Sequence, residues 1–128
     1  MSETPILVVD DDPNARDIVR MYLEAKGYRV STAADGKEAL AKLEEVRPEL
    51  VLLDVMMPGM DGWEVARVIK NHPQFASVRL VMLTARSDFT DKQEGLRSGA
   101  DDYIVKPIRL EELGERVEKN LAARRVEE

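Results

Sequence analysis

Four short apolar runs recur along the chain, and a segment with helical spacing of its apolar residues follows each of them. The runs are Ile6–Val9, Leu50–Leu53, Leu80–Leu83 and Tyr103–Val105. Short continuous apolar runs are typical of strands buried on both faces, as in parallel sheets covered by helices on both sides. A fifth segment, Arg29–Ala33, alternates in polarity and predicts a strand at an edge of the sheet.

The segments between these runs carry helix signals. The first predicted helix follows Asp12 and Pro13, which suit an N-cap and a first helical residue, and it ends at Gly27. The second begins at the capping-box pair Asp35 and Glu38. Three further helices are predicted over residues 63–71, near 91–98 and from about 110 to 124. One face of the first helix carries its apolar residues: Ala15, Ile18, Val19, Tyr22 and Leu23.

Five strands alternating with five helices predict an α/β fold. We expect a flavodoxin-like three-layer sandwich, with helices on both faces of a five-stranded parallel sheet. Right-handed crossovers leave few topologies, and the strand order 2-1-3-4-5 is favoured for five strands. A chain of 128 residues has room for one ordinary domain, and no repeat or low-complexity segment divides it.

Composition argues against several classes of function. A net charge of −6 argues against direct nucleic-acid binding by this domain, because such binding needs a basic face. The absence of cysteine excludes disulfides and thiolate metal sites and makes a cytoplasmic location the default. No apolar run approaches the roughly 20 residues that a bilayer requires, and the N-terminus lacks a signal-peptide pattern, so no membrane association is expected.

Under the predicted topology, reactive side chains end several strands at one edge of the sheet. Asp10 and Asp11 follow the first strand, and Asp54 ends the third strand, which lies beside the first. Thr84 follows the fourth strand and Lys106 the fifth. Ligands of α/β proteins bind in the crevice at the carboxyl ends of parallel strands, so we expect these five side chains to share one site.

Three carboxylates at one site predict a metal ion. They repel one another and cannot all stay ionised without compensation. A divalent cation removes this conflict, and oxygen donors select Mg²⁺, with Mn²⁺ as the alternative. We predict Asp11 and Asp54 as ligands, Asp10 as a ligand directly or through water, and the backbone carbonyl of Met56 as a further donor.

The same residues suit phosphoryl transfer. Asp54 lies in the middle of the predicted cluster and is the natural nucleophile, because a carboxylate can form an aspartyl phosphate. Lys106 can bind a phosphoryl oxygen, and with a metal ion it leaves the site nearly neutral toward an incoming phosphoryl group. The Thr84 hydroxyl can donate to another oxygen only after transfer, which predicts a switch in the segment after the fourth strand.

Five motifs in this order resemble the receiver domain of response regulators, the phospho-accepting module of two-component signalling. They are Val8–Asp11, Leu53–Asp54 with Met57–Pro58 and Asp61–Gly62, Leu83–Ala85, Gly99–Tyr103, and Lys106–Pro107. The resemblance spans essentially the whole chain. It implies a chemotaxis-regulator-like fold, a single receiver domain over residues 1–128, and phosphorylation of Asp54. It also implies a signalling module that catalyses only its own phosphorylation and dephosphorylation.

The resemblance further implies partners and a switch. A sensor histidine kinase or phosphotransfer protein would supply the phosphoryl group. Tyr103 would be the switch aromatic that rotates inward with Thr84, and Lys106–Pro107 a cis peptide. The surface of the fourth helix, fifth strand and fifth helix would signal to a downstream protein target or an output domain, so the receiver either acts alone or belongs to a larger regulator. The segment from Lys92 to Arg116 resembles regulators that dimerise on phosphorylation, which leaves a homodimer open.

Two other classes share parts of the pattern. Haloacid-dehalogenase-type phosphatases also form an aspartyl phosphate, and Asp10 and Asp12 have the Asp-x-Asp spacing of that class. Its second acidic motif should follow a late strand, however, whereas Asp101–Asp102 precedes one. An FMN-binding flavodoxin shares the topology, but three aspartates after the first strand would repel the FMN phosphate. The receiver interpretation is therefore favoured, with a metal ion as the expected cofactor.

Overall fold

The computed structural model describes residues 3–57, 59, 61–85 and 99–127. In chain order its elements are β1 (Pro5–Val9), α1 (Pro13–Ala25), β2 (Arg29–Ala33), α2 (Gly36–Val46), β3 (Leu50–Asp54), α3 (Gly62–Asn71), β4 (Arg79–Ala85), β5 (Asp102–Lys106) and α5 (Leu110–Glu127). The helix expected near residues 91–98 lies outside the described part of the chain. The other expected elements are present, with bounds that differ by one to three residues at several ends.

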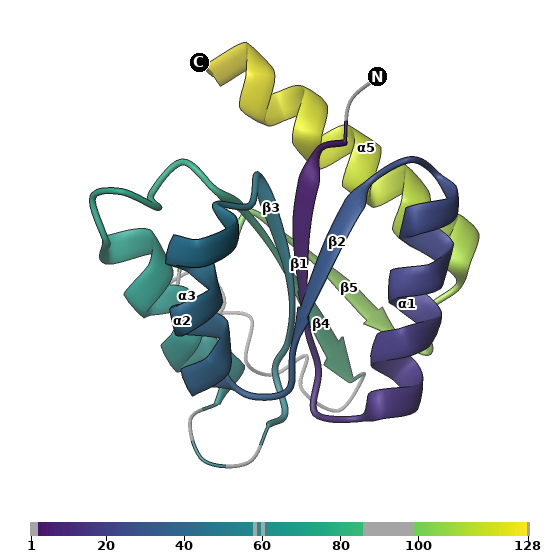
Figure 1. Ribbon diagram of the computed structural model, residues 1–128, viewed down its shortest axis with the longest axis horizontal. Helices are drawn as coiled ribbons and strands as arrows, with labels where there is room; N and C mark the ends of the chain where they lie inside the picture. The colour runs from purple at the N-terminus through teal and green to yellow at the C-terminus, as the bar shows by residue number, and fades with distance from the viewer. Residues whose placement is uncertain (1–2, 58, 60, 86–98, 128) are drawn as a thin grey trace.

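The strands form one parallel sheet in the order β2-β1-β3-β4-β5, which confirms the predicted topology. Helices α2 and α3 lie on one face of this sheet and α1 and α5 on the other, giving the three-layer sandwich (Figure 1). The alternating segment forms β2 at an edge, as its pattern indicated. The continuous apolar run forms β3 between β1 and β4, where every one of its residues is buried.

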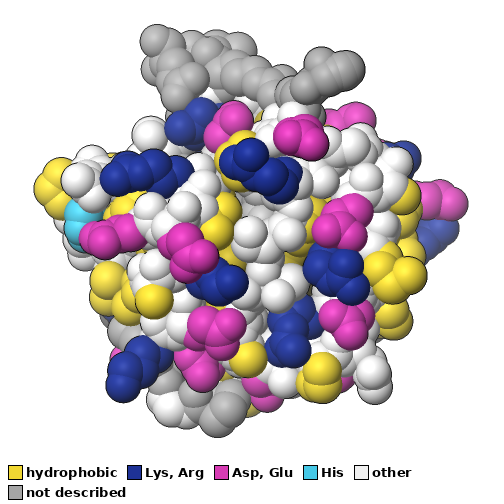
Figure 2. Space-filling view, in the orientation of Figure 1, with side chains coloured by type: hydrophobic (Ala, Val, Ile, Leu, Met, Phe, Trp, Pro, Cys, Tyr) yellow, Lys and Arg dark blue, Asp and Glu magenta, His cyan; other side chains and the backbone are white. Residues whose placement is uncertain are grey.

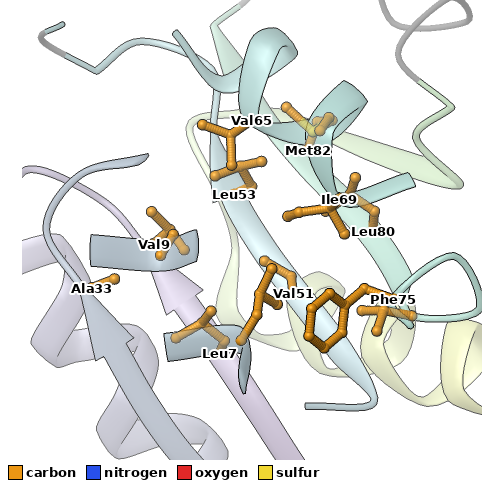
Figure 3. Close-up of a cluster of buried hydrophobic side chains, with 14 of the residues drawn as sticks. Leu7, Val9, Ala33, Val51, Leu53, Val65, Ile69, Phe75, Leu80 and Met82 are labelled. Carbon is orange, nitrogen blue, oxygen red and sulfur yellow. The ribbon is translucent and has the colours of Figure 1, made fainter. Parts of the chain in front are cut away.

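Alternate residues of the strands feed two separate apolar cores. In β1, Leu7 and Val9 face α2 and α3, whereas Ile6 and Val8 face α1 and α5. Figure 3 shows the first of these cores, in which strand residues such as Leu53 lie beside α3 side chains. Because each fully buried aliphatic side chain contributes about 1.5–3 kcal/mol, both cores hold β1 and β3 in place.

The N-caps predicted at Asp12 and Asp35 are present, and Asp61 provides a third that was not predicted. The side chains of Asp12, Asp35 and Asp61 cap the N-termini of α1, α2 and α3 by accepting from backbone N–H groups. The apolar face of α1 is only partly covered. Its Val19 and Leu23 are buried, but Ile18 on the same face is 54% exposed.

The start of α3 is packed directly against the end of β3 at a glycine. Gly62 donates its N–H to the carbonyl of Val55 at 2.8 Å. A Cβ atom added to Gly62 would lie 2.4 Å from the carbonyl oxygen of Asp54 and 2.7 Å from the Cα of Val55. Because both neighbours are backbone atoms, only glycine allows this approach, which sets the position of Asp54 relative to α3.

We predict that Gly62→Ala destabilises the protein by roughly 3 kcal/mol, because the backbone of β3 or α3 must move to admit the methyl group. The matched control is Gly27→Ala. At Gly27 a methyl group would meet nothing within 4 Å, and the positive φ of 97° is the only obstacle. We expect this control to lose about 1 kcal/mol. Urea unfolding of both variants tests the difference, and equal losses would contradict the steric account.

Candidate functional site

Three carboxylates meet where β1 and β3 end. Val9 pairs with Leu53 in the parallel register of these strands, so Asp10 and Asp54 are the next residues along adjacent strands. One carboxylate oxygen from each of Asp10, Asp11 and Asp54 lies within 4.8 Å of the others. Asp10 and Asp54 are each only 4% exposed, whereas Asp11 is exposed. The cluster therefore contains two acids that water can hardly solvate.

Asp54 of β3 is paired with a lysine of β5, the strand that lies on the other side of β4 in the sheet. The Nζ atom of Lys106, at the end of β5, lies 3.2 Å from Oδ1 of Asp54, and the Met56 N–H donates to the same oxygen at 3.2 Å. Burial raises the pKa of Asp54 from 3.8 to about 6; Lys106 lowers it less than burial raises it, and the negative charge of Asp10 raises it further. Lys106 alone thus supplies less positive charge than the three clustered acids require.

Asp10 is held by contacts that extend beyond its own strand. Its N–H donates to the carbonyl of Ala33 at 3.1 Å, and its Oδ1 accepts the N–H of Asp12 at 2.9 Å. Its carbonyl accepts a hydrogen bond from Nη1 of Arg16 in α1, also at 2.9 Å. Arg16 was not predicted from the sequence, because a side-chain hydrogen bond to a carbonyl six residues earlier leaves no pattern in the sequence.

The other predicted site residues lie in β4, in β5 and directly after β3. Thr84 is buried in β4, one residue before the end of that strand, and its Cα pairs with that of Val105. Met56 follows β3 and its side chain is 64% exposed. Tyr103 of β5 is partly buried and packs against the core under α2 and α3. The bond between Lys106 and Pro107 is cis, which confirms that expectation.

The charged residues that resemble a dimerisation surface have partners within this chain. Nη1 of Arg116 lies 2.7 Å from Oδ1 of Asp102, and Asn120 donates to Oδ2 of Asp102 at 3.0 Å. Burial alone would raise the pKa of Asp102, but these two partners outweigh it and the pKa is lowered. Asp101 is paired with Lys70 at 2.8 Å. The homodimer stays a prediction.

The donor set fits a hard divalent cation. Carboxylate oxygens are the ligands that Mg²⁺ prefers, and thiolate or imidazole donors play no part in the acidic cluster. The two nearly buried acids, Asp10 and Asp54, also need more positive charge than one lysine supplies. The residues at this edge of the sheet could therefore hold a divalent metal ion.

The sheet order and the cluster of strand-end acids with Lys106 fit a phospho-accepting receiver domain, and the comparison with known families shows that class. Residues 6–118 match the response regulator receiver domain, and the chain belongs to that family. It is 46% identical over 116 residues to the DNA-binding response regulator MtrA of Mycolicibacterium smegmatis, covering 91% of this chain and 50% of that protein. It is 45% identical over 116 residues to the transcriptional regulatory protein ResD of Bacillus subtilis, covering 91% of this chain and 47% of that protein.

This chain thus spans about half the length of those two relatives. Solved structures of single domains match it almost from end to end. The chemotaxis protein CheY4 of Vibrio cholerae is 36% identical with a TM-score of 0.88, covering 93% of this chain and 99% of that chain. A CheY-like receiver domain protein of Methanospirillum hungatei is 34% identical with a TM-score of 0.91, covering 99% of this chain and 100% of that chain. Within the described residues, no helix has the length and apolar character needed to cross a membrane.

We predict that Asp54→Asn stabilises the metal-free protein near neutral pH by roughly 1–3 kcal/mol. The folded-state pKa of about 6 lies above the ordinary value of 3.8. Between these two values the unfolded chain releases the proton while the folded protein keeps it, so the wild type loses stability as the pH rises through this window. The loss is complete above the folded-state pKa.

Urea unfolding in a chelator across this pH range measures the effect. The stability gap between Asp54→Asn and the wild type should open as the pH rises and then stay constant. Asp17→Asn is the matched control, because Asp17 lies on the exposed surface of α1. This control should shift stability by less than about 0.5 kcal/mol. If the stability difference between Asp54→Asn and the wild type is the same at both ends of the pH range, the raised pKa does not belong to Asp54.

Proposed function

We propose that Asp54 accepts a phosphoryl group in a Mg²⁺-dependent reaction and that this event switches the β5–α5 side of the domain. Receiver domains of this family accept a phosphoryl group on an aspartate with Mg²⁺. The observation that carries the assignment is the nearly buried Asp54 carboxylate, which has Lys106 at 3.2 Å and lies in a cluster with Asp10 and Asp11. Its place at the end of the central strand makes it the acid on which the other groups converge.

The roles follow from position and charge. An Asp54 oxygen attacks phosphorus, a new O–P bond forms, and the bond from phosphorus to the donor's leaving atom breaks with its electron pair. Asp10, Asp11, Asp54 and the Met56 carbonyl would hold Mg²⁺, which when bound neutralises charge on the phosphoryl oxygens. Lys106 pairs with Asp54 before transfer and can then bind a phosphoryl oxygen as a compact cation.

The switch begins at Thr84 in our proposal. Thr84 is buried in β4 beside β5, one residue before the strand ends. A phosphoryl group on Asp54 offers its hydroxyl a new, charged acceptor, and the end of β4 moves toward it. Tyr103 is only partly buried against the core, and we propose that it turns inward as that strand end moves. The signal then reaches the surface of β5 and α5, together with the predicted helix near residues 91–98, which lies outside the described part of the chain.

The partners follow from the family and from charge. We propose that a sensor histidine kinase or phosphotransfer protein donates the phosphoryl group. The signal then passes to a protein target or an output domain. MtrA is a DNA-binding response regulator of about twice this length. On the face seen in Figure 2, Lys and Arg side chains are interspersed with Asp and Glu, which favours protein contacts over nucleic-acid contacts for this domain. We place the module in the cytoplasm, acting as a phosphorylation switch with no external substrate to turn over.

We predict that the wild type gains the mass of one phosphoryl group when it is incubated with Mg²⁺ and a small phosphodonor. Asp54→Asn should gain none, because its amide is not a nucleophile. Asp12→Asn is the matched control, since it removes one charge beside the cluster while asparagine still caps α1. Intact-mass spectrometry with and without a chelator reads the result. Equal labelling of the wild type and Asp54→Asn would overturn the assignment.

We predict that Thr84→Ala is phosphorylated but fails to switch. The nucleophile, Lys106 and the acidic cluster are unchanged in this variant, so labelling should persist. The hydroxyl that responds to the phosphoryl group is gone, so the NMR shifts of Tyr103 and of α5 should change little on phosphorylation. Thr84→Ser keeps the hydroxyl and should switch like the wild type. Full switching by Thr84→Ala would contradict the proposed route.

A further inference from the structure

The connection from β1 to α1 is closed around Asp10 by three hydrogen bonds. Two of them are local or belong to the sheet: the Asp10 N–H donates to Ala33, and Asp10 Oδ1 accepts from the Asp12 N–H. The third comes from a charged side chain in α1, because Nη1 of Arg16 donates to the Asp10 carbonyl at 2.9 Å. Asp10 itself is 4% exposed, so its carbonyl obtains a strong donor where water has little access.

These bonds hold both peptide groups that flank Asp11. The peptide before Asp11 carries the carbonyl held by Arg16, and the peptide after it carries the N–H held by Asp10 Oδ1. Asp11 is the exposed member of the acidic cluster, so packing does little to direct its side chain. The direction of its carboxylate, which lies within 4.8 Å of those of Asp10 and Asp54, depends on the two peptide groups.

We propose that Arg16 is a positioning residue for the acidic cluster: it holds the peptide between Asp10 and Asp11 so that the Asp11 carboxylate faces Asp54. This inference rests on the proposed function, because the cluster matters through the divalent cation that it would bind. Arg16 acts through the backbone of Asp10 and touches neither the phosphoryl group nor the metal ion. Groups that orient ligands in this way typically change metal affinity 10–100-fold when they are removed.

If Arg16 acted only through its positive charge, removing it would change the Mg²⁺ affinity in the opposite direction. A cation near three acids competes with a divalent cation, so removing the charge of Arg16 without any change of geometry would strengthen metal binding. Removing a positioning residue weakens metal binding, because the Asp11 carboxylate is no longer held in place. Arg16→Met therefore separates the two roles by the direction of the change, and methionine keeps much of the apolar stem.

The matched control is Arg20→Met. Arg20 lies one turn further along α1, carries the same charge and pairs with Glu24 at 2.9 Å on the helix surface. Titration calorimetry with Mg²⁺ should give Arg16→Met a dissociation constant roughly 10-fold or more above that of the wild type. Arg20→Met should bind Mg²⁺ as well as the wild type or more tightly. Arg16→Lys, which keeps a charged donor, should recover part of the loss, whereas Arg16→Gln should recover less than Arg16→Lys.

A measurement on the metal-free protein tests the same inference without the proposed function. In a chelator, the Asp12 amide hydrogen should exchange with water several-fold faster in Arg16→Met than in the wild type or Arg20→Met, because its bond to Asp10 is no longer held in place. Two results would overturn the inference. One is an Asp12 amide that exchanges in Arg16→Met at the wild-type rate, and the other is Mg²⁺ binding by Arg16→Met that is unchanged or tighter.

If Arg16→Met does not fold by circular dichroism, Arg16→Lys and Arg16→Gln decide by the same two measurements. A wild type that binds no Mg²⁺ would overturn the proposed function, and the Asp12 exchange would still decide whether Arg16 holds the loop.

Discussion

The burial of two carboxylates side by side at the ends of adjacent strands is the constraint on which the site depends. Asp10 and Asp54 are each 4% exposed, and the register of β1 against β3 makes them neighbours. Burying ionised acids together costs free energy unless opposite charge or hydrogen bonds compensate. Burial raises the pKa of Asp54 to about 6, and the lysine at 3.2 Å compensates only in part. The site is thus arranged to gain from the arrival of a cation.

The rest of the fold keeps these acids from moving apart. β1 and β3 lie side by side within the sheet and are buried on both faces, so shifting either strand would disturb two cores at once. Gly62 lets α3 begin against the backbone of Asp54 and Val55, which limits movement along the strand. The packing energy of the cores therefore offsets the electrostatic cost at the strand ends. The acids of the cluster stay close together there, where they could bind a cation.

Much of this could be predicted from the sequence because the signals are local. Apolar runs, capping aspartates and glycines identify the elements, and parallel strands bring their carboxyl ends to one edge, so the order of Asp10, Asp54 and Lys106 along the chain was enough to place them together. The contact between Arg16 and the Asp10 carbonyl could not be predicted in this way. It depends on a side-chain rotamer and on the angle at which α1 leaves β1, and neither leaves a periodic pattern. The exposure of Ile18 was missed for a similar reason, because helical spacing defines a face but not how much of it the neighbouring elements cover.

The two edges of the sheet differ sharply in how their charges are paired. At the amino ends of β3, β4 and β5, the acids have basic partners within 4 Å: Asp101 with Lys70 and Arg79, Asp102 with Arg116, and Glu49 with Arg124. At the carboxyl ends, Asp10, Asp11 and Asp54 lie together, and Lys106 pairs with Asp54.

The pKa values follow this division, since that of Asp102 is lowered and that of Asp54 is raised. Paired charges at one edge contribute to holding α3 and α5 against the sheet, whereas the cluster of Asp10, Asp11 and Asp54 lies at the other edge. A divalent cation is therefore attracted to the carboxyl edge, and the ion pairs that hold the helices lie at the opposite end of the strands, where binding at the site does not disturb them.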